Sequence, residues 1–297
     1  MKTIELNTRA LELFREAFLN NAYDWYDKAS ARVPKETLER FEIGASRPTL
    51  MDRLRVDDSK LLEADLKIID SERRLRDKFL NRLVIPIRDE LGNLVGFAGR
   101  SHKDSGAKYI NTASSEIFEK GRILYGLNSS FENILRDGYA ILVEGYFGVM
   151  QLFSKGIKNV VASCGTSLTD GQAELLSRYT DYVYICYDGD AAGKISTLRA
   201  VGKLLKAGLR SFIVSLPDGS DPDDYVKTYG VKAFEKLLLD AVPEWKLVVK
   251  HSREKDTLPI LQQWGEAIKG KIFEEDILRR LPKNICKIVF NNNNKNK

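Results

Sequence analysis

Residues 139–196 read YAILVEGYFGVMQLFSKGIKNVVASCGTSLTDGQAELLSRYTDYVYICYDGDAAGKIS, in which short apolar runs alternate with stretches of helical spacing. We expect strands at 139–144, 158–163, 181–188 and 212–216, and helices at 146–155, 169–178 and 191–207. Short buried strands separated by helices of this length are typical of a parallel sheet whose crossover helices cover its faces. The predicted fold class of this part is therefore α/β, with a Rossmann-like parallel sheet.

The segments on either side of this sheet have different patterns. From residue 1 to about residue 80, apolar residues recur at helical spacing. Residues 82–100, RLVIPIRDELGNLVGFAGR, contain two β-rich runs around Leu91-Gly92-Asn93, which predicts a hairpin, and Pro86 predicts an irregular or edge strand. Helical spacing returns after Val231. We divide the chain into an N-terminal mixed α/β subdomain (1–137), a parallel-sheet domain (138–230), a C-terminal helical subdomain (231–290) and a disordered tail (291–297), so the fold is α+β as a whole.

The composition limits the classes of protein that the chain can belong to. Of its 297 residues, 43% are hydrophobic and 30% charged, and the mean hydropathy is −0.30, which excludes a disordered, collagen-like or membrane-embedded chain. A net charge of +5 allows an anionic partner without requiring one. Three separated cysteines and two histidines suggest neither a disulfide framework nor a zinc site. Because no secretory or membrane-spanning run occurs, we expect a cytoplasmic protein with no membrane partner.

Acidic residues follow three of the predicted strands. Glu144 ends the first, Asp188 and Asp190 follow the third, and Asp221 and Asp223 come after the fourth. Ligands of open α/β sheets bind beyond the carboxyl ends of the strands, where these carboxylates would repel one another unless a cation joins them. Oxygen ligands without His or Cys favour Mg²⁺ or Mn²⁺, and phosphoryl transfer, nucleotidyl transfer or phosphodiester hydrolysis. The alternative is structural: a turn at 188–190 and a helix N-cap at Asp221 followed by proline.

These residues resemble a Toprim domain, which primases, topoisomerases, gyrase and some nucleases share. The segments VEGYFGVMQLFSKGIKNVVASCGTSLT, CYDGDAAGKIS and LPDGSDPDDYVKTYG are similar to the catalytic core of bacterial DnaG-type primases. Upstream, RLVIPIRDELGNLVGFAGR, AKYINTASSEIFEKGRILYGL and, more weakly, LERFEIGAS are similar to the same family. The resemblance runs in colinear order from about residue 8 to about residue 250.

The resemblance implies a DNA primase core that makes short RNA primers from ribonucleoside triphosphates on a single-stranded DNA template, with Mg²⁺ or Mn²⁺ and as a monomer. Glu144, Asp188 and Asp190 would be the principal metal ligands, and Asp221 and Asp223 would complete the acidic cluster. The residues expected to line the groove for template and nucleotide are Arg82, Arg88, Arg100, Lys108, Tyr109, Asn111 and Lys120. Strand alternation places Arg82 and Arg88 on the same side, and Tyr109 is available for base stacking. A solvated strand face is the alternative.

Three departures from the family pattern stand out. The family has an acid four residues after the glutamate, where this chain has Gly148. This loss predicts a weaker second cation site, a stronger dependence on Mn²⁺, or an inactive relative. No zinc ribbon is present, so we expect no zinc in this chain and poor initiation unless a separate zinc-ribbon protein acts in trans or the chain is a fragment. The region 231–290 is too short for a full helicase-binding domain, which makes a replicative helicase a doubtful partner.

Two other functions remain open from the sequence. A Toprim nuclease would use the same carboxylates to activate water, although the primase-like segments upstream argue against it. A non-catalytic single-stranded-DNA-binding scaffold of the replication machinery would keep the fold and the basic residues. Gly148 favours that second alternative, whereas the retention of Glu144, Asp188 and Asp190 opposes it.

Overall fold

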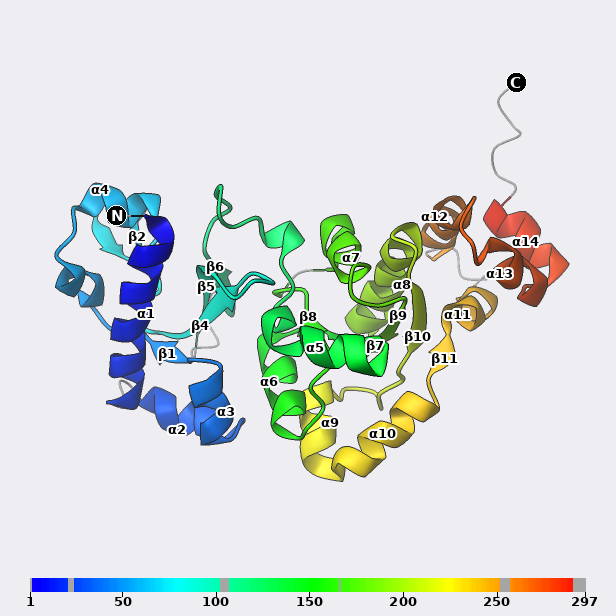
Figure 1. Ribbon diagram of the computed structural model, residues 1–297, viewed down its shortest axis with the longest axis horizontal. Helices are drawn as coiled ribbons and strands as arrows, with labels where there is room; N and C mark the ends of the chain where they lie inside the picture. Colours follow the sequence, from blue (N-terminus) through cyan, green and yellow to red (C-terminus); the bar gives the residue numbers. More distant parts are fainter. Residues whose placement is uncertain (1, 21–23, 102–106, 166, 252–256, 291–297) are drawn as a thin grey trace, which may run out of the picture. The chain divides into compact units, whose positions relative to one another are not determined.

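The structure is a computed structural model of residues 1–297, and it describes all of them except 1, 21–23, 102–106, 166, 252–256 and 291–297 (Figure 1). The chain separates into two compact units, Met1–Asn128 (unit 1) and Ser129–Lys297 (unit 2). The boundary expected from the sequence, between residues 137 and 138, lies nine residues further along the chain. The finer division at residues 230 and 231 stays a prediction, and the tail 291–297 lies outside the described residues.

Unit 1 contains a small antiparallel sheet with strands in the order β1-β4-β5-β6 and a separate hairpin, β2-β3. The strands are β1 (Gly44–Ala45), β2 (Lys67–Ile69), β3 (Leu75–Asp77), β4 (Arg82–Arg88), β5 (Leu94–Ser101) and β6 (Tyr109–Asn111). The α-helices are α1 (Thr3–Leu19), α2 (Trp25–Ser30), α3 (Lys35–Arg40) and α4 (Asp58–Glu63), and the 3₁₀ helices are η2 (Leu50–Leu54) and η3 (Lys120–Arg122). The mixed α/β character predicted for this region is confirmed.

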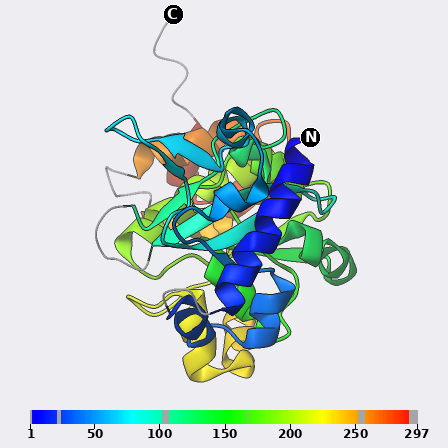
Figure 2. The same cartoon turned by 90° about the vertical axis from the view of Figure 1, so that its left-hand side faces the viewer.

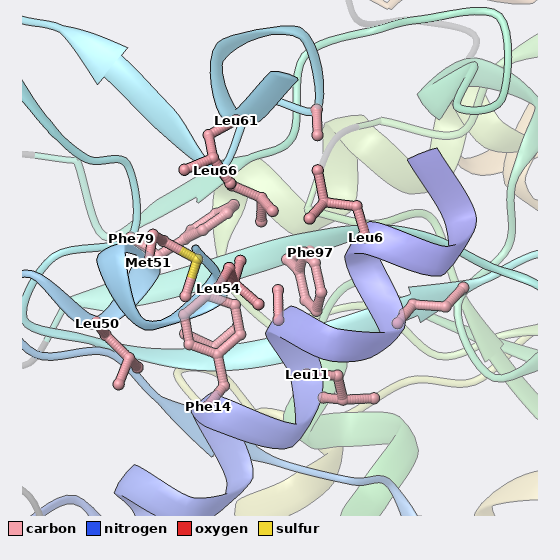
Figure 3. Packing of buried hydrophobic residues seen from close by; sticks show 14 of the residues in the cluster. Leu6, Leu11, Phe14, Leu50, Met51, Leu54, Leu61, Leu66, Phe79 and Phe97 are labelled. Atoms are coloured by element: carbon pink, nitrogen blue, oxygen red, sulfur yellow. The ribbon is translucent and has the colours of Figure 1, made fainter. Parts of the chain in front are cut away.

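The core of unit 1 lies between α1 and the sheet. Figure 2 shows α1 running across this unit, and Figure 3 shows its apolar side chains meeting those of the sheet and of η2. Phe14, Phe79 and Phe97 pack edge to face, with ring centroids 5.3–6.2 Å apart. A Cβ atom at Gly44 would lie 2.5 Å from the Cβ of Phe14, so glycine is what lets α1 approach β1 this closely.

The hairpin predicted at residues 82–100 is confirmed as β4 and β5. Its turn is held by Asp89, whose carboxylate accepts the backbone N–H groups of Leu91 and Asn93, and Gly92 has a positive φ of 87°. β4 is not an edge strand of the sheet, because β1 pairs with its first half. Pro86 lies beyond that pairing and before a β-bulge at Ile87 and Arg88. The missing N–H therefore costs no ladder hydrogen bond to β1, and the irregularity expected there is real.

Unit 2 contains a five-stranded sheet with the order β11-β10-β9-β7-β8, in which only β11 is antiparallel. The strands are β7 (Tyr139–Val143), β8 (Val160–Ala162), β9 (Tyr182–Ile185), β10 (Arg210–Ile213) and β11 (Val242–Pro243). The connecting helices are α6 (Tyr146–Ser154), α7 (Asp170–Leu176) and α8 (Ala191–Lys206), and α5 (Leu127–Asp137) precedes the sheet. The predicted parallel α/β sheet is confirmed, with one shift: the strand expected at 212–216 runs from Arg210 to Ile213.

The strand order gives this sheet a switch point between β7 and β9. The chain leaves β7 toward β8 on one side and then crosses back to β9 on the other. Because such crossovers are right-handed, α6 lies on one face of the sheet, and α7 and α8, which pack together, lie on the opposite face (Figure 1). β7 lies between β9 and β8, and its residues Ala140–Val143 are fully buried. The carboxyl ends of β7 and β9 therefore open onto the crevice where ligands of such sheets bind.

The rest of unit 2 is mostly helical, as predicted, with one exception. Its helices are α9 (Pro222–Tyr229), α10 (Val231–Leu239), α11 (Glu244–His251), α12 (Leu258–Ile268), α13 (Glu274–Arg280) and α14 (Lys283–Phe290). Short β11 interrupts them because it extends the sheet beside β10. The guanidinium of Arg210 on β10 binds buried Glu244 of α11 at 2.7 Å and Asp276 of α13 at 3.2 Å, which anchors these helices. Within the part of the chain that the structure describes, no helix is long and apolar enough to cross a membrane.

Candidate active site

The first candidate carboxylate, Glu144, stands directly after β7 at the switch point. Its Oε1 atom accepts the backbone N–H of Asp188 at 3.3 Å, which joins the ends of β7 and β9. Burial raises the pKa of the Glu144 carboxyl above its usual value, the N–H of Asp188 opposes this, and the charge of Asp190 raises the pKa further. A partly buried carboxylate under repulsion from a second one binds a cation readily, because the cation removes the cost of both charges.

The Asp188-Gly189-Asp190 triplet forms a tight turn that only glycine permits at its centre. The N–H of Gly189 donates to the carbonyl of Ser220 at 2.9 Å, and a Cβ atom at Gly189 would lie 2.3 Å from the carbonyl oxygen of Pro217. The turn is thus pressed against the loop that follows β10. This contact places the triplet next to Ser220, the residue that precedes the second acidic segment at Asp221.

Asp190 is also the N-cap of α8. Its Oδ1 atom accepts the N–H of Gly193 at 2.7 Å. A Cβ atom at Gly193 would lie 2.1 Å from the carbonyl oxygen of Asp188, so this position also requires glycine. The capping bond fixes the carboxylate with one oxygen, and Asp190 is exposed to solvent.

The second acidic segment begins α9. Asp221 is its N-cap and accepts the N–H of Asp224 at 2.7 Å, and Pro222 occupies the first turn. Carboxylate oxygens of Asp221, Asp223 and Asp224 lie within 4.8 Å of one another, and Asp223 is only 4% exposed. Asp221 and Asp223 were expected to complete the acidic cluster, and Asp224 joins them although the sequence did not assign it to the site. The sequence shows the three acids of DPDD, but the backbone of the first turn of α9 decides which of their carboxylates lie close together.

The structural and functional alternatives posed by the sequence are not exclusive. Asp190 and Asp221 do cap helices, as the structural alternative predicts, yet each cap occupies one carboxylate oxygen. A hydrogen bond joins the Glu144 carboxylate to the backbone of Asp188, and the charge of Asp190 raises the pKa of Glu144. Among the described residues, the cluster of three ligand atoms within 4.8 Å is Asp221, Asp223 and Asp224, and it does not include the predicted principal ligands. Roles for Glu144, Asp188 and Asp190 therefore stay predictions.

Gly148 lies on α6, one turn after Glu144. A Cβ atom there would lie 3.3 Å from Cγ2 of Val143, which is a tight but adjustable contact. The backbone conformation is ordinary for a helix, because Gly148 is not among the glycines with positive φ. A Cβ atom at residue 148 therefore requires only a small shift of the Val143 side chain.

The predicted groove residues of unit 1 fall into two groups. In the ladder, Arg100 stands opposite Tyr109, and Ala98 opposite Asn111, so Arg100, Tyr109 and Asn111 share one face of the sheet. Arg100 donates to the Tyr109 hydroxyl at 2.9 Å, and its guanidinium lies 5.5 Å from the ring centroid. Arg82 stands on the opposite face, where it donates to the carbonyls of Gly99 and Ala107. The single face expected from the sequence is therefore divided.

The remaining three cationic side chains differ in their contacts and in their exposure to solvent. The Arg88 guanidinium binds the Glu42 carboxylate and donates to the carbonyl of Gly92 at 2.8 Å, and the bulge at Arg88 interrupts the alternation that placed it beside Arg82. Lys108 is exposed just before β6, and Lys120 is half-buried in η3. Their roles as template or nucleotide contacts are not tested by this arrangement and stay predictions.

The acidic residues of unit 2 fit a hard divalent cation. All the donors are carboxylate oxygens, three of them gather within 4.8 Å, and one of the three is buried. Nearby, Lys194 on α8 binds Asp218 at 2.8 Å, which holds the pKa of Asp218 below its usual value. Cys164 and Cys186 are buried close by, and burial raises the pKa of the Cys186 thiol, which leaves it unreactive.

Comparison with known proteins gives matches along both units. Residues 12–131 match the family described as DNA primase catalytic core, N-terminal domain, and residues 141–226 match the Toprim-like family. A DNA primase of Aquifex aeolicus is 40% identical over 253 residues, which is 83% of this chain and 50% of that protein. The first curated DNA primases that it matches are much longer, and the chain spans 36–50% of their length.

Solved structures agree with the sequence matches. The zinc-binding and RNA polymerase domains of the Aquifex aeolicus primase superpose with a TM-score of 0.85 at 33% identity, covering 98% of this chain and 74% of that one. A DnaG primase catalytic domain bound to single-stranded DNA gives a TM-score of 0.79 at 28% identity, covering 93% of this chain and 96% of that one. The fold predicted from the resemblance is thereby confirmed.

Proposed function

The chain belongs to the DnaG-type DNA primase family, and from this we propose that it is a primase catalytic core that synthesises short RNA primers on single-stranded DNA. The observation that carries the proposal is that hydrogen bonds connect the acidic segments at the switch point of the unit 2 sheet to the loop that leads into the acidic cluster of α9. Glu144 hydrogen-bonds to the end of β9, and the turn at Gly189 hydrogen-bonds to the loop that leads into the acidic cluster at Asp221.

Each part of this site has a distinct task in the proposal. Asp221, Asp223 and Asp224 would hold one divalent cation, and Glu144, Asp188 and Asp190 would hold a second. Bound Mg²⁺ or Mn²⁺ supplies charge neutralisation for the phosphates of the incoming nucleotide. The helix caps orient the carboxylates of Asp190 and Asp221 before any ligand arrives, so these two side chains lose less entropy on binding.

In the proposal, unit 1 contacts the template. The face with Arg100, Tyr109 and Asn111 combines a cation with an aromatic ring, as surfaces that bind single strands without reading sequence do. Exposed Lys108 adds a phosphate contact. Substrates are ribonucleoside triphosphates, the chain acts as a monomer in the cytoplasm, and a zinc-ribbon protein or a replicative helicase would be its partner at initiation.

The test is primer synthesis on mixed-sequence single-stranded DNA with labelled ribonucleotides, in Mg²⁺ and in Mn²⁺. We compare the unaltered protein with Asp190→Asn and Asp190→Ala. Asparagine caps a helix about as well as aspartate does, whereas alanine costs about 1 kcal/mol at an N-cap. Both variants should lose synthesis while they keep their affinity for DNA, because both lack the charge. Retained synthesis in Asp190→Asn would show that this residue only caps α8.

A preformed primer separates catalysis from initiation. If the unaltered protein extends a supplied primer but starts none, the proposal holds and initiation needs a partner. If it binds DNA tightly and extends nothing with either metal, the non-catalytic scaffold is the better function. Metal-dependent shortening of an end-labelled template would instead favour the Toprim nuclease.

A further inference from the structure

The strand register places two polar side chains on either side of Glu144. In the ladder of β7 and β9, Leu142 is the partner of Ile185, and the same register continued by two residues places Glu144 opposite Tyr187. In the ladder of β7 and β8, Val143 is the partner of Ala162, so Glu144 also pairs with Ser163. Residues paired in this way project from the same face of a sheet. Ser163, Glu144 and Tyr187 thus form a row across three adjacent strand ends.

The Tyr187 hydroxyl is enclosed in this row. Tyr187 is only 4% exposed, and its hydroxyl oxygen has no contact within normal hydrogen-bond geometry. Burial raises the pKa of Tyr187, the Glu144 carboxylate raises it further, and the Ser163 hydroxyl lowers it, so both neighbours act on this oxygen. A buried hydroxyl that lacks a partner costs free energy, which the structure recovers when the hydroxyl donates to an acceptor.

Ser163 is itself held in place from behind. The side-chain amide of Gln172 donates to the carbonyl of Ser163 at 3.3 Å, and its amide oxygen accepts the N–H of Thr169 in the capping box of α7. Gln172 is fully buried. The backbone of Ser163 is therefore fixed. The side chains of Tyr187 and Glu144 are the members of the row whose orientation can still change.

We propose that Tyr187 is a positioning residue for Glu144: its enclosed hydroxyl, between Glu144 and Ser163, donates to the carboxylate and aims it at the acidic cluster. This rests on the proposed function, because it assigns Glu144 to the metal site. Tyr187 contacts neither DNA nor nucleotide in this role. It acts as the hydrogen-bonding neighbours of metal ligands do, by fixing the orientation of the ligand.

The test measures metal binding directly, without relying on activity. The metal-free full chain is titrated with Mn²⁺, and free Mn²⁺ is followed by electron paramagnetic resonance. Tyr187→Phe removes only the hydroxyl, and it should weaken Mn²⁺ binding about tenfold, the size of effect that such neighbours have. The midpoint of thermal unfolding in EDTA should not fall, because no hydrogen bond of normal geometry is lost in the metal-free protein.

Tyr184→Phe is the matched control. Tyr184 is on β9, three residues before Tyr187 and on the other face of the sheet, where it stacks on Phe212 at 5.1 Å between ring centroids. Its hydroxyl is remote from the row, so Mn²⁺ binding should be unchanged. Ser163→Ala is the second test variant and should weaken Mn²⁺ binding by a smaller factor. Unchanged binding in Tyr187→Phe, or equal losses in Tyr187→Phe and Tyr184→Phe, would overturn the inference.

The outcomes also separate this inference from the proposed function. If Tyr187→Phe weakens Mn²⁺ binding as expected but the unaltered protein extends no primer, the primase activity would be contradicted and the inference would stand. A protein that extends primers while Tyr187→Phe binds Mn²⁺ as tightly as the unaltered chain would contradict the inference alone.

Discussion

In unit 1 the guanidinium of Arg88 is bound by Glu42 and that of Arg82 by two carbonyls, whereas in unit 2 Glu144, Asp190 and Asp221 form no ion pair with any described residue. Glu144 is half-buried as well, so its charge carries a cost that no neighbouring cation relieves. Paired charges hold a fold together, and unpaired charges at a strand end are available for a ligand. The difference supports the proposal that the carboxylates of unit 2 bind a cation, whereas Arg82 and Arg88 of unit 1 stabilise the fold.

The largest effect should come from the buried carboxylate of the acidic cluster. Asp223→Asn keeps the shape of the side chain and removes its charge, and we expect primer extension to fall by about 100-fold or more, since a catalytic cation contributes several kcal/mol. The measurement is extension of a supplied primer in Mg²⁺. Affinity for single-stranded DNA is the control and should not fall. Full activity in Asp223→Asn would contradict the proposal that the carboxylates of unit 2 hold a catalytic cation.

A second large effect concerns the packing beneath the site. Gly189→Ala forces a Cβ atom to within 2.3 Å of the Pro217 carbonyl oxygen, and the expected loss of stability is about 1–3 kcal/mol in urea unfolding. Gly148→Ala is the matched control, because its nearest contact is 3.3 Å and alanine favours a helix by about 0.5–1 kcal/mol. Equal stability of the two variants would mean that the turn at residue 189 is not rigidly packed.

The Arg88 and Glu42 pair tests the structural role of charge in unit 1. Both side chains are partly exposed, and a double-mutant cycle with Arg88→Met and Glu42→Gln should give a coupling of about 0.5–1 kcal/mol in unfolding free energy. If Arg88 served DNA alone, the two changes would be additive in stability and Arg88→Met would weaken DNA binding instead.

Asp77 is the exception in unit 1, because it is a buried carboxylate without an ion pair among the described residues. Burial raises the pKa of Asp77, although the N–H of Met51 donates to it at 3.1 Å. The folded state thus keeps a proton that the unfolded state has lost, so stability should fall as pH rises from the usual aspartate value of 3.8 through the raised pKa. Asp77→Asn should remove this part of the pH dependence. The measurement is the unfolding free energy between pH 4 and pH 7. If it falls more steeply with pH in Asp77→Asn than in the unaltered protein, the pKa of Asp77 is not raised in the folded state.

The smallest expected effect belongs to exposed Lys108. If it contacts a phosphate, Lys108→Ala should reduce the slope of log K against log salt by about 0.7 for single-stranded DNA and lower affinity only a few-fold. Lys236→Ala, on α10 of unit 2, is the exposed control and should leave the slope unchanged. An unchanged slope in Lys108→Ala would leave the template contacts to Arg100 and Tyr109.

Much of the architecture follows from local pattern. The alternation of apolar runs and helical stretches predicts the parallel sheet. Strands buried on both faces are continuous apolar runs, whereas the crossover helices have apolar residues at helical spacing. The hairpin at residues 82–100 follows from its turn residues. Acids at three strand ends, together with the resemblance of their segments, predict the family and place the candidate site at the carboxyl edge of the sheet.

Only the tertiary structure decided which charges meet. Register and a β-bulge separate Arg82 from Arg100 and commit Arg88 to Glu42, which lies 46 residues away in sequence. The first turn of α9 brings Asp224 into the acidic cluster, and the register of β7 and β9 places Tyr187 opposite Glu144. Local sequence determines periodicity within one element, whereas the pairing of side chains depends on how distant elements align, and no local pattern encodes that alignment.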